Sequence, residues 1–442
     1  MEVDCQETVG VLQMKIGIIG GSGLENPNLL EDFNIKEIET PFGKPSSPLT
    51  TGRIDNIDVV IISRHGVKHE IPPSEVNNRA NVFALKDEGC KYIISTTAVG
   101  SLREEIKRGD FVIVDQFIDF TKHRKTTFFD KFEFGPIHTP MANPFSEILR
   151  KKLIESCEKL KFQNHKKGTV ITIEGPRFST KAESNLFRQW EGDIINMSIA
   201  PECILANEAE IPYAVIAMST DYDCWKDDEP PVTWDVIREI MKNNAERVKK
   251  VLLEVINSFS REQEILKLKD KVRTIPDFPK KGVLFRDITP LLQDKESLKR
   301  FTDIFYERYK DIKIDIVAGI ESRGFILAGI LAERLGAGLS LIRKPGKLPY
   351  ETIKQEYSLE YGTDMVEMHK DSVKLGQKVL LVDDLIATGG TSLASCNLIK
   401  KLGGQVVECA FLIELEELGG IEKLKKENHY SFSLVKFKED EL

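Results

Sequence analysis

The sequence predicts an α/β protein built as two domains, and three observations support this fold class. The chain has 442 residues, more than one compact core usually holds. Short apolar runs of strand type alternate with helical stretches along the chain, as they do in α/β proteins. A long amphipathic segment and a cluster of Pro and Gly residues interrupt this alternation, so that one series of strands ends and a second begins.

The predicted strands are β-branched and leucine-rich runs. They cover residues 16–19, 59–62, 92–95, 111–114, 170–173 and 214–218 in the first series, and 316–320, 339–342, 379–382 and 406–412 in the second. Between the series, apolar residues recur at three- or four-residue steps from 237 to 259, which predicts an amphipathic helix that ends the first domain. Pro276, Pro279, Gly282 and Pro290 then exclude one continuous helix.

These patterns divide the chain into four parts. They are an N-terminal extension (1–14), a first domain (15–260), a short junction (261–273) and a second domain (274–442). Residues 260–271 are rich in charge and contain no Gly or Pro. We therefore expect the junction to be helical rather than a flexible tether.

Composition excludes several classes of function. The net charge of −8 argues against broad binding to nucleic acid or anionic membranes. No apolar run approaches the roughly 20 residues of a membrane span, and the acidic N-terminus lacks the layout of a signal peptide. The seven cysteines are scattered and never in C-x-x-C spacing, which predicts reduced thiols and no zinc framework. We expect a cytoplasmic protein that acts on small molecules and uses no organic cofactor.

The most informative segment of the second domain is 378–391, with the sequence KVLLVDDLIATGGT. Asp383 and Asp384 follow a predicted buried strand, at the end where open α/β sheets bind ligands. The small-residue loop after them gives backbone N–H groups access to an anion at the start of a helix. The two carboxylates can accept from ribose hydroxyls, and the loop beside them can bind a phosphate. Together they predict a phosphorylated ribose as ligand. The alternative is a buried strand that runs into a capped helix, with the acids only as caps.

This segment resembles the phosphoribosyl-diphosphate (PRPP) motif of the type I phosphoribosyltransferases. Segments 274–290, 318–325, 341–349 and 358–362 resemble the adenine phosphoribosyltransferase branch, so the resemblance covers 274–418. It implies a mostly parallel, Rossmann-like sheet and transfer of a phosphoribosyl group from PRPP to adenine.

The same resemblance implies roles for individual residues. Adenine is bound by Leu284, Phe285 and Arg286, with Phe285 stacked on the ring, and Glu360 handles the proton of the incoming nitrogen. PRPP is bound by Arg323, Lys344, Lys347, Tyr361, Asp383, Asp384, Ala387, Thr388, Gly389, Gly390 and Thr391. Arg323, Lys344 and Lys347 supply positive charge for the pyrophosphate. Mg²⁺ is expected with PRPP, chelated mainly by the substrate, so no protein metal site is expected. Pro345 stands where the family often has a basic residue, so no third charge is expected in that loop.

Three loops of the first domain follow predicted strands and are rich in small or hydroxyl residues. They are Gly20-Gly21-Ser22-Gly23, Ser63-Arg64-His65-Gly66 and residues 96–101. Asn26 occupies the place of the third Gly in a dinucleotide motif, and Gly66 the place of a zincin's Glu between His65 and His69. Neither a dinucleotide nor a zinc site is therefore predicted. The loops instead predict one phosphate pocket, with Arg64 and His65 as cationic donors.

These loops, together with segments 174–179, 196–198 and 219–225, resemble the 5′-methylthioadenosine phosphorylases, within the trimeric purine nucleoside phosphorylases. The match covers about 15–256 and implies an α/β/α domain with a mixed sheet. It implies phosphate binding by Ser22, Arg64, His65, Thr97, Ala98 and Ser198. It implies nucleoside binding by Phe178, Ser179, Met197, Asp221, Asp223 and, from a neighbouring subunit, His138.

Asp221 and Asp223 indicate the base. Cleavage of the N9–ribose bond leaves negative charge on the purine, so a protonated Asp221 at N7 lowers the barrier as the catalytic acid. A carboxylate near position 6 accepts from an amino group and repels a 6-oxo group, which favours adenine. Trp234 falls where related sequences have a smaller residue, which predicts a narrower 5′ pocket.

The two halves together predict a bifunctional salvage enzyme, because adenine made in the first reaction is the substrate of the second. A trimeric first domain and a dimeric second domain would close as a homo-hexamer with 32 symmetry. One alternative is a 6-oxopurine nucleoside phosphorylase fused to a phosphoribosyltransferase. Another is a PRPP-sensing protein whose transferase domain is inactive.

Overall fold

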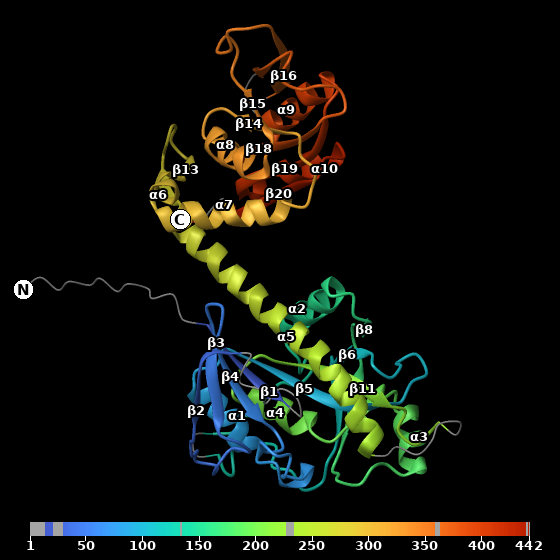
Figure 1. Cartoon of the computed structure of the whole chain (residues 1–442). Helices are drawn as coiled ribbons and strands as arrows, with labels where there is room; N and C mark the ends of the chain where they lie inside the picture. Colours follow the sequence, from blue (N-terminus) through green and yellow to red (C-terminus); the bar gives the residue numbers. More distant parts are fainter. Residues whose placement is uncertain are drawn as a thin grey trace, which may run out of the picture. The chain divides into compact units, whose positions relative to one another are not determined.

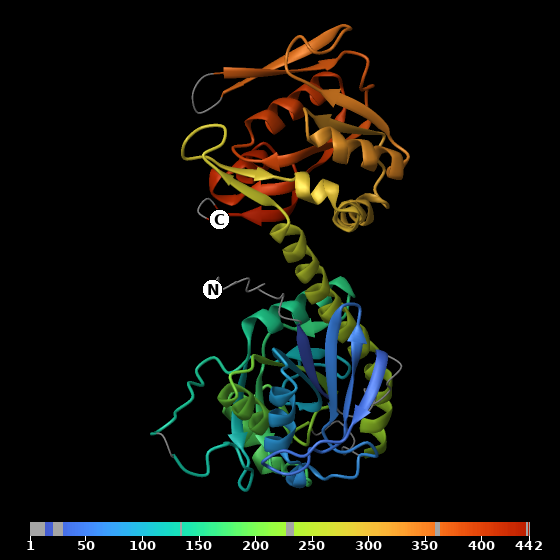
Figure 2. The ribbon, with the colours of Figure 1, turned by 90° about the vertical axis from the view of Figure 1, so that its left-hand side faces the viewer.

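The computed structural model describes residues 14–20, 30–132, 135–226, 234–358, 363–438 and 441, without the side chains of 234–239 and 241–243. The chain divides into two compact units, residues 1–261 and 262–442 (Figures 1 and 2). The division falls inside the long helix α5 (Trp234–Asp270), so the charged segment predicted to be helical is part of one helix. No helix in the described ranges is long and apolar enough to cross a bilayer.

Unit 1 is built on a mixed sheet of 11 strands. The main path runs β2–β3–β4–β1–β5–β10–β9–β7, and β11 lies beside β5, with β6 and β8 beyond it. β1 is parallel to β4 and β5, whereas β3 and β4 are antiparallel. The strands are β1 (Lys15–Gly20), β2 (Glu31–Lys36), β3 (Leu49–Ile54), β4 (Ile57–Ser63), β5 (Tyr92–Ser101), β6 (Phe111–Ile113), β7 (Gln116–Phe120), β8 (Asn164–His165), β9 (Thr169–Ile173), β10 (Ile194–Asn196) and β11 (Tyr213–Asp221).

Helices cover both faces of this sheet, as the sequence predicts for an α/β/α domain. Side chains alternate along β1, so that Ile16 and Ile18 pack with α2 and α5 while Ile19 packs with α1 and α4. The predicted apolar face of α5 is buried there, through Val248, Leu252 and other side chains at helical spacing. The remaining elements are η2 (Pro73–Glu75), α1 (Asn78–Asp87), α2 (Glu147–Lys159), α3 (Lys181–Gln189) and α4 (Ile199–Glu208).

Unit 2 has a parallel five-stranded sheet in the order β15–β14–β18–β19–β20, with two separate antiparallel hairpins, β12–β13 and β16–β17. The strands are β12 (Arg273–Pro276), β13 (Leu284–Asp287), β14 (Ile316–Ile320), β15 (Gly338–Ile342), β16 (Thr352–Ser358), β17 (Thr363–His369), β18 (Lys378–Ile386), β19 (Gln405–Leu415) and β20 (Ser431–Phe437). The helices are α6 (Thr289–Gln293), α7 (Lys295–Tyr309), α8 (Gly324–Leu335), α9 (Gly390–Lys401), η3 (Glu416–Leu418) and α10 (Gly420–Lys426). The α/β class with a mixed and a mostly parallel sheet is thus confirmed.

Two predicted strand ends are wrong. Residues 96–101 continue β5 instead of forming a loop, because β11 pairs with them in register, from Thr96 opposite Ile216 onward. Asp383 and Asp384 lie inside β18 rather than after it, because β19 continues the ladder beside them. In both places the neighbouring strand extends the structure past the apolar run that marks the strand in the sequence.

Candidate active sites

Unit 1 contains a cavity of about 540 Å³ in which most of the predicted phosphorylase residues meet. Its lining includes Arg64, His65, Thr97, Ala98, Phe178, Ser179, Met197, Ser198, Asp221 and Asp223. These side chains come from strands β5 and β11 and from the segments after β4, β9 and β10. Ser22 lies outside the described residues, and the side chain of Trp234 does too. His138 does not line the cavity; it is exposed, with its ring 6.1 Å from that of Phe132.

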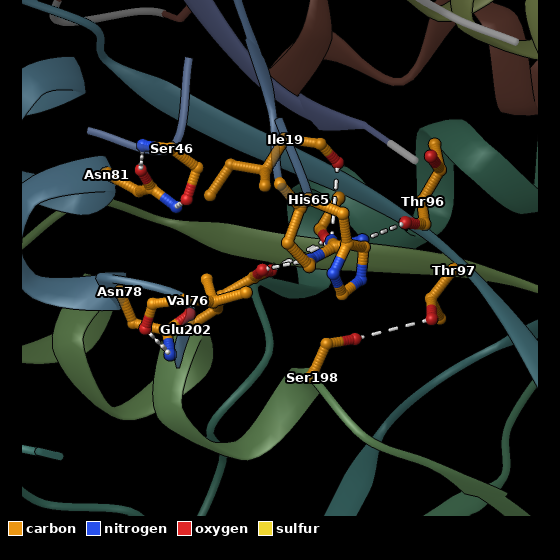
Figure 3. Close-up of polar contacts among 12 residues, drawn as sticks. Ile19, Ser46, His65, Val76, Asn78, Asn81, Thr96, Thr97, Ser198 and Glu202 are labelled. Carbon is orange, nitrogen blue, oxygen red and sulfur yellow. Dashed lines mark hydrogen bonds and ion pairs between the residues drawn. The ribbon is translucent and has the colours of Figure 1, made fainter. Parts of the chain in front are cut away.

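Hydroxyl and amide groups gather at one end of this cavity, which we call the phosphate end. The Thr97 and Ser198 hydroxyl oxygens lie 3.4 Å apart, and Figure 3 shows them facing each other. The Asn196 amide donates to Ser198 Oγ at 3.2 Å and its oxygen accepts from Thr172 at 3.0 Å. Asn196 therefore orients the two hydroxyls, a role that sequence reasoning did not assign.

Arg64 also borders the phosphate end, but its charge is already compensated. It is 2% exposed and pairs with the fully buried Glu202 of α4 through Nε and Nη2. The expectation of a cationic donor is therefore only half met, since the guanidinium lines the cavity as one member of a neutral pair. Glu202 escaped sequence reasoning because it stands far along the chain in an apolar helix.

His65 differs more from the expected cationic donor. Its Nδ1 lies 2.9 Å from the carbonyl oxygen of Ile71, which can only accept, so Nδ1 carries the hydrogen. Burial, and then the charge of Arg64, lower the pKa of His65 to about 4. The ring is consequently neutral near pH 7, and Nε2 is left as an acceptor.

Asp221 and Asp223 lie at the end of β11 and just beyond it, and both side chains border the cavity. Burial raises the pKa of both carboxyls. Oδ2 of Asp221 lies 2.7 Å from the Thr220 hydroxyl oxygen, which is also 3.2 Å from the Val99 carbonyl oxygen. The backbone N–H of Asp223 donates to Oδ1 of Asp221 at 2.8 Å, so both carboxyl oxygens have a polar neighbour.

Apolar side chains form much of the remaining lining, beside the polar residues His69 and Glu70. Met197 and Phe178 line it, and the Phe178 ring is 47% exposed. Ala245 and Val248 of α5 complete the wall. These two were predicted only as part of the helix's buried face, and nothing in their spacing distinguishes a core position from a cavity wall.

In unit 2, Asp383 and Asp384 are 9% and 8% exposed, side by side on β18. Arg323, which precedes α8, contacts Asp384 at 2.7 Å and lies 4.9 Å above the Phe285 ring. Burial raises the pKa of both carboxyls, and their mutual repulsion adds to the effect on Asp383. Among the described residues Arg323 is the only cation paired with them, so this pair of acids keeps an excess of negative charge when ionised.

The predicted pyrophosphate cations are each paired with an acid. Lys344 contacts Asp364 and, at 3.0 Å, the Tyr357 hydroxyl, while Lys347 contacts Glu321. Pairing through side chains from distant segments was not predicted. Glu360 and Tyr361 lie outside the described residues.

The remaining predicted transferase residues lie on two further segments. Leu284, Phe285 and Arg286 form strand β13, with Phe285 5.1 Å from the Phe278 ring. The Arg286 guanidinium donates to the carbonyls of Lys438 and Glu441, so its side chain supports the strand. Ala387, Thr388 and Gly389 connect β18 to α9, and Gly390 and Thr391 are the first residues of that helix. Across the described residues, no group of three or more His, Cys, Asp or Glu side chains is arranged to hold a metal ion.

Comparison with known proteins assigns both units. The phosphorylase superfamily matches residues 15–257, and the phosphoribosyl transferase domain matches residues 287–440. The chain belongs to the phosphorylase superfamily. It carries in addition a phosphoribosyl transferase domain, so it is a fusion of two enzyme folds.

Individual phosphorylases resemble unit 1 closely. The S-methyl-5′-thioadenosine phosphorylase of Xenopus tropicalis is 54% identical over 251 residues, covering 56% of this chain and 89% of that protein. The protein of the same name from Thermofilum pendens is 50% identical, covering 57% and 95%. The structure of methylthioadenosine phosphorylase from Schistosoma mansoni in complex with adenine is 42% identical, with a TM-score of 0.54, and covers 56% of this chain and 92% of that one.

Proposed function

We propose that unit 1 converts 5′-methylthioadenosine and phosphate to adenine and 5-methylthioribose 1-phosphate, and that unit 2 joins adenine to PRPP to give AMP and pyrophosphate. The observation that carries the proposal is that the buried Asp221 and the partly buried Asp223 border the same cavity as Thr97 and Ser198. The names of the relatives and the adenine complex support the first reaction. Adenine as acceptor in unit 2 rests on the resemblance around Phe285.

In the first reaction a phosphate oxygen attacks C1′ of the ribose and the C1′–N9 bond breaks. Asp221 gives its proton to N7 as negative charge develops on the purine, and burial favours the protonated form of this carboxyl because it raises the pKa. The hydrogen of HPO₄²⁻ balances the proton that adenine gains, so the cycle consumes no external acid.

In this proposal, hydrogen bonds rather than a net positive charge of the site hold the phosphate. Thr97 and Ser198 offer hydroxyl groups, and the neutral His65 offers an acceptor for the hydrogen of HPO₄²⁻. Asp223 accepts from the 6-amino group of adenine and opposes a 6-oxo group when it is ionised. The 6-oxopurine alternative therefore predicts a different residue at this position.

In the second reaction Arg323, Lys344 and Lys347 stabilise the leaving pyrophosphate, and the backbone from Ala387 to Thr391 holds the 5′-phosphate. Mg²⁺ enters with PRPP and neutralises part of its charge. Asp383 and Asp384, buried side by side on β18 with Arg323 as their partner, would accept hydrogen bonds from the ribose hydroxyls of PRPP, whose own oxygens would chelate the cation. Glu360 takes the proton of the incoming adenine nitrogen.

We also propose a cytoplasmic homo-hexamer. The six cysteines of the described chain are free thiols, which suits a reducing compartment. Leu339 and Leu341, 49% and 37% exposed on edge strand β15, offer apolar surface for a dimer contact in unit 2. His138 is exposed on unit 1, and we propose that it reaches the nucleoside bound in a neighbouring subunit. Mass measurement in solution tests this assembly, and a stable monomer refutes it.

The deciding experiment supplies pure protein with 5′-methylthioadenosine, phosphate and PRPP with Mg²⁺ and measures AMP. We expect AMP with the complete mixture, adenine alone without PRPP, and neither without phosphate. Inosine in place of 5′-methylthioadenosine should give almost no base. Preferred cleavage of inosine would favour the 6-oxopurine alternative.

The sensing alternative is tested separately on unit 2. Adenine and PRPP should give AMP in the wild type and far less in Glu360→Ala, since that substitution removes the proposed proton acceptor. PRPP binding without AMP formation in the wild type would favour an inactive, sensing domain.

A further inference from the structure

The wall of the unit 1 cavity contains a closed buried network centred on Glu202. This carboxylate is 0% exposed and accepts from the hydroxyl of Tyr213 at 2.8 Å and that of Ser95 at 2.9 Å, besides Nε and Nη2 on one edge of Arg64. Arg64 links this carboxylate to the strand that carries Thr97, because it also donates to the carbonyl oxygen of Thr96; Figure 3 labels Glu202, Thr96 and Thr97. Oε2 accepts from Arg64 Nη2, Ser95 and Tyr213, and Oε1 accepts from Arg64 Nε, so three side chains hold the carboxylate in place.

The network leaves one hydrogen of Arg64 for a ligand. Nη2 donates to Ser95 Oγ at 2.6 Å and to Glu202 at 3.1 Å, Nε donates to Glu202, and Nη1 donates to the Thr96 carbonyl at 3.0 Å. A guanidinium has five N–H groups, so the second hydrogen of Nη1 has no acceptor within the described part of the chain. Because Arg64 borders the cavity, this hydrogen is the one available to an anion there.

The charge of Arg64 is cancelled at close range. A cation and an anion in contact in a buried environment present little net field to a third ion, and the neutral His65 adds none. Arg64 therefore contributes direction rather than charge to anion binding. The hydrogen bond that Arg64 donates to an anion depends on the groups that hold the guanidinium in place. A shift of about 1 Å in a positioned group is enough to cost roughly 10²-fold in rate.

We propose that Glu202 is a positioning residue for the phosphate substrate: it holds Arg64 so that one Nη1 hydrogen points to the phosphate end, while cancelling the charge of the guanidinium. This inference rests on the proposed phosphorolysis and adds a residue to it. Ser95 belongs to the same support, since its hydroxyl bridges Arg64 and Glu202. Tyr213 donates to the carboxylate, interacts with the Ser95 hydroxyl and makes no hydrogen bond to Arg64 among the contacts of the described residues.

The test compares Glu202→Gln, Ser95→Ala and Tyr213→Phe with wild type. Gln places an amide N–H against an Arg64 donor, so we expect the KM for phosphate to rise tenfold or more, with the KM for 5′-methylthioadenosine changed less than twofold. Ser95→Ala should raise the phosphate KM three- to tenfold, and Tyr213→Phe less than threefold. Glu208→Gln is the matched control, because Glu208 ends the same helix, accepts from the backbone of Phe128 and does not line the cavity.

A second readout does not depend on activity. All three tryptophans, Trp190, Trp225 and Trp234, belong to unit 1, so their fluorescence during heating follows this unit. Inorganic phosphate should raise the unfolding temperature of wild type and Glu208→Gln, and should protect Glu202→Gln only at concentrations at least tenfold higher. If Glu202→Gln does not fold, Ser95→Ala carries the same comparison.

The outcomes separate the two claims. A wild-type protein that binds phosphate but cleaves no nucleoside refutes the proposed function, and the phosphate protection series still tests the role of Glu202. A phosphate KM and protection within twofold of wild type in both Glu202→Gln and Ser95→Ala overturn the positioning role. Equal changes in the KM values of both substrates, together with lowered stability, also overturn it, since they indicate a purely structural residue.

Discussion

The two units prepare for anionic substrates in different ways. In unit 1 the one arginine at the phosphate end, Arg64, is 2% exposed and its partner Glu202 is 0% exposed. In unit 2 the side chains of Lys344 and Lys347 are 41% and 48% exposed, and their acidic partners Asp364 and Glu321 are 33% and 12% exposed. Both arrangements pair a cation with an acid, but they differ in how much water reaches the pair.

Water access determines what a substrate can replace. Breaking a buried pair costs about 3–5 kcal/mol, whereas an exposed pair contributes only about 0.2–1 kcal/mol. An incoming anion therefore cannot displace Glu202 from Arg64, but it can displace the acids from Lys344 and Lys347 at little cost. If both units bind anions as proposed, the buried pair in unit 1 stays in place on binding, whereas the exposed lysines of unit 2 exchange their acidic partners for the substrate. The following experiments test that contrast.

The largest expected effect comes from the catalytic acid of the fixed site. Asp221→Asn keeps the size of the side chain but removes the transferable proton, so phosphorolysis should fall about 10²- to 10⁴-fold. Because burial raises the pKa of Asp221, wild-type activity should also decline as alkaline pH ionises it. AMP formation from added adenine in the same variant is the internal control and should be unchanged. Phosphorolysis within tenfold of wild type would show that N7 receives its proton from elsewhere.

The neutral His65 gives unit 1 a characteristic dependence of stability on pH. Its pKa is about 4 when folded against 6.5 in the unfolded chain, so between these values the unfolded chain binds more protons. Stability conferred by the neutral ring is therefore present above pH 6.5 and is lost as the pH falls to about 4, by up to roughly 3 kcal/mol.

The measurement is the free energy of unfolding of unit 1, followed by tryptophan fluorescence at pH 6.5 and pH 4.5. The difference between wild type and His65→Gln isolates this group from the buried carboxyls, which titrate in the opposite direction. His123→Gln, at an exposed position, is the control and should leave the wild-type profile unchanged. Parallel profiles for wild type and His65→Gln would mean that His65 is not held neutral.

The segment of unit 2 proposed to hold the 5′-phosphate, residues 387–391, would do so through its backbone. Gly389 of the phosphate loop and Gly420, the first residue of α10, lie against each other. A Cβ on Gly420 would overlap the Ala387 carbonyl oxygen and lie 2.7 Å from Cγ1 of Ile386 and 3.0 Å from the Gly389 nitrogen. Gly420→Ala should therefore displace the loop and raise the KM for PRPP about tenfold or more, with a smaller change in the KM for adenine.

Gly329→Ala in α8 is the matched control for that substitution. A Cβ there meets nothing within 4 Å, so the KM for PRPP should stay at the wild-type value. An unchanged KM for PRPP in Gly420→Ala would show that the loop tolerates displacement.

The sequence predicts which segments approach a substrate better than it predicts how their charges are paired. Strand runs followed by Arg64, Thr97 or Asp221 indicate a shared sheet edge, and the structure brings these residues to one cavity. Glu202 could not be found in this way, because its partner Arg64 is 138 positions away and helix α4 reads as apolar core. The partners of Lys344 and Lys347 depend likewise on hairpin β16–β17 and the end of β14, which no local pattern specifies.

The smallest effect, and the most direct test of the contrast, concerns Asp364. Replacing it with Asn leaves Lys344 without its acidic partner, so pyrophosphate no longer has to displace a carboxylate. An exposed ion pair contributes about 0.2–1 kcal/mol, which corresponds to at most about a fivefold change in affinity. We therefore expect the KM for PRPP to decrease by no more than about fivefold. Glu351→Gln is the control, because Glu351 pairs with Lys370 at 3.0 Å, joins the same two segments of chain and is also exposed. A rise in the KM for PRPP would instead mean that Asp364 holds Lys344 as Glu202 holds Arg64. The two units would then bind their anions by the same strategy, and the difference in exposure would have no functional consequence.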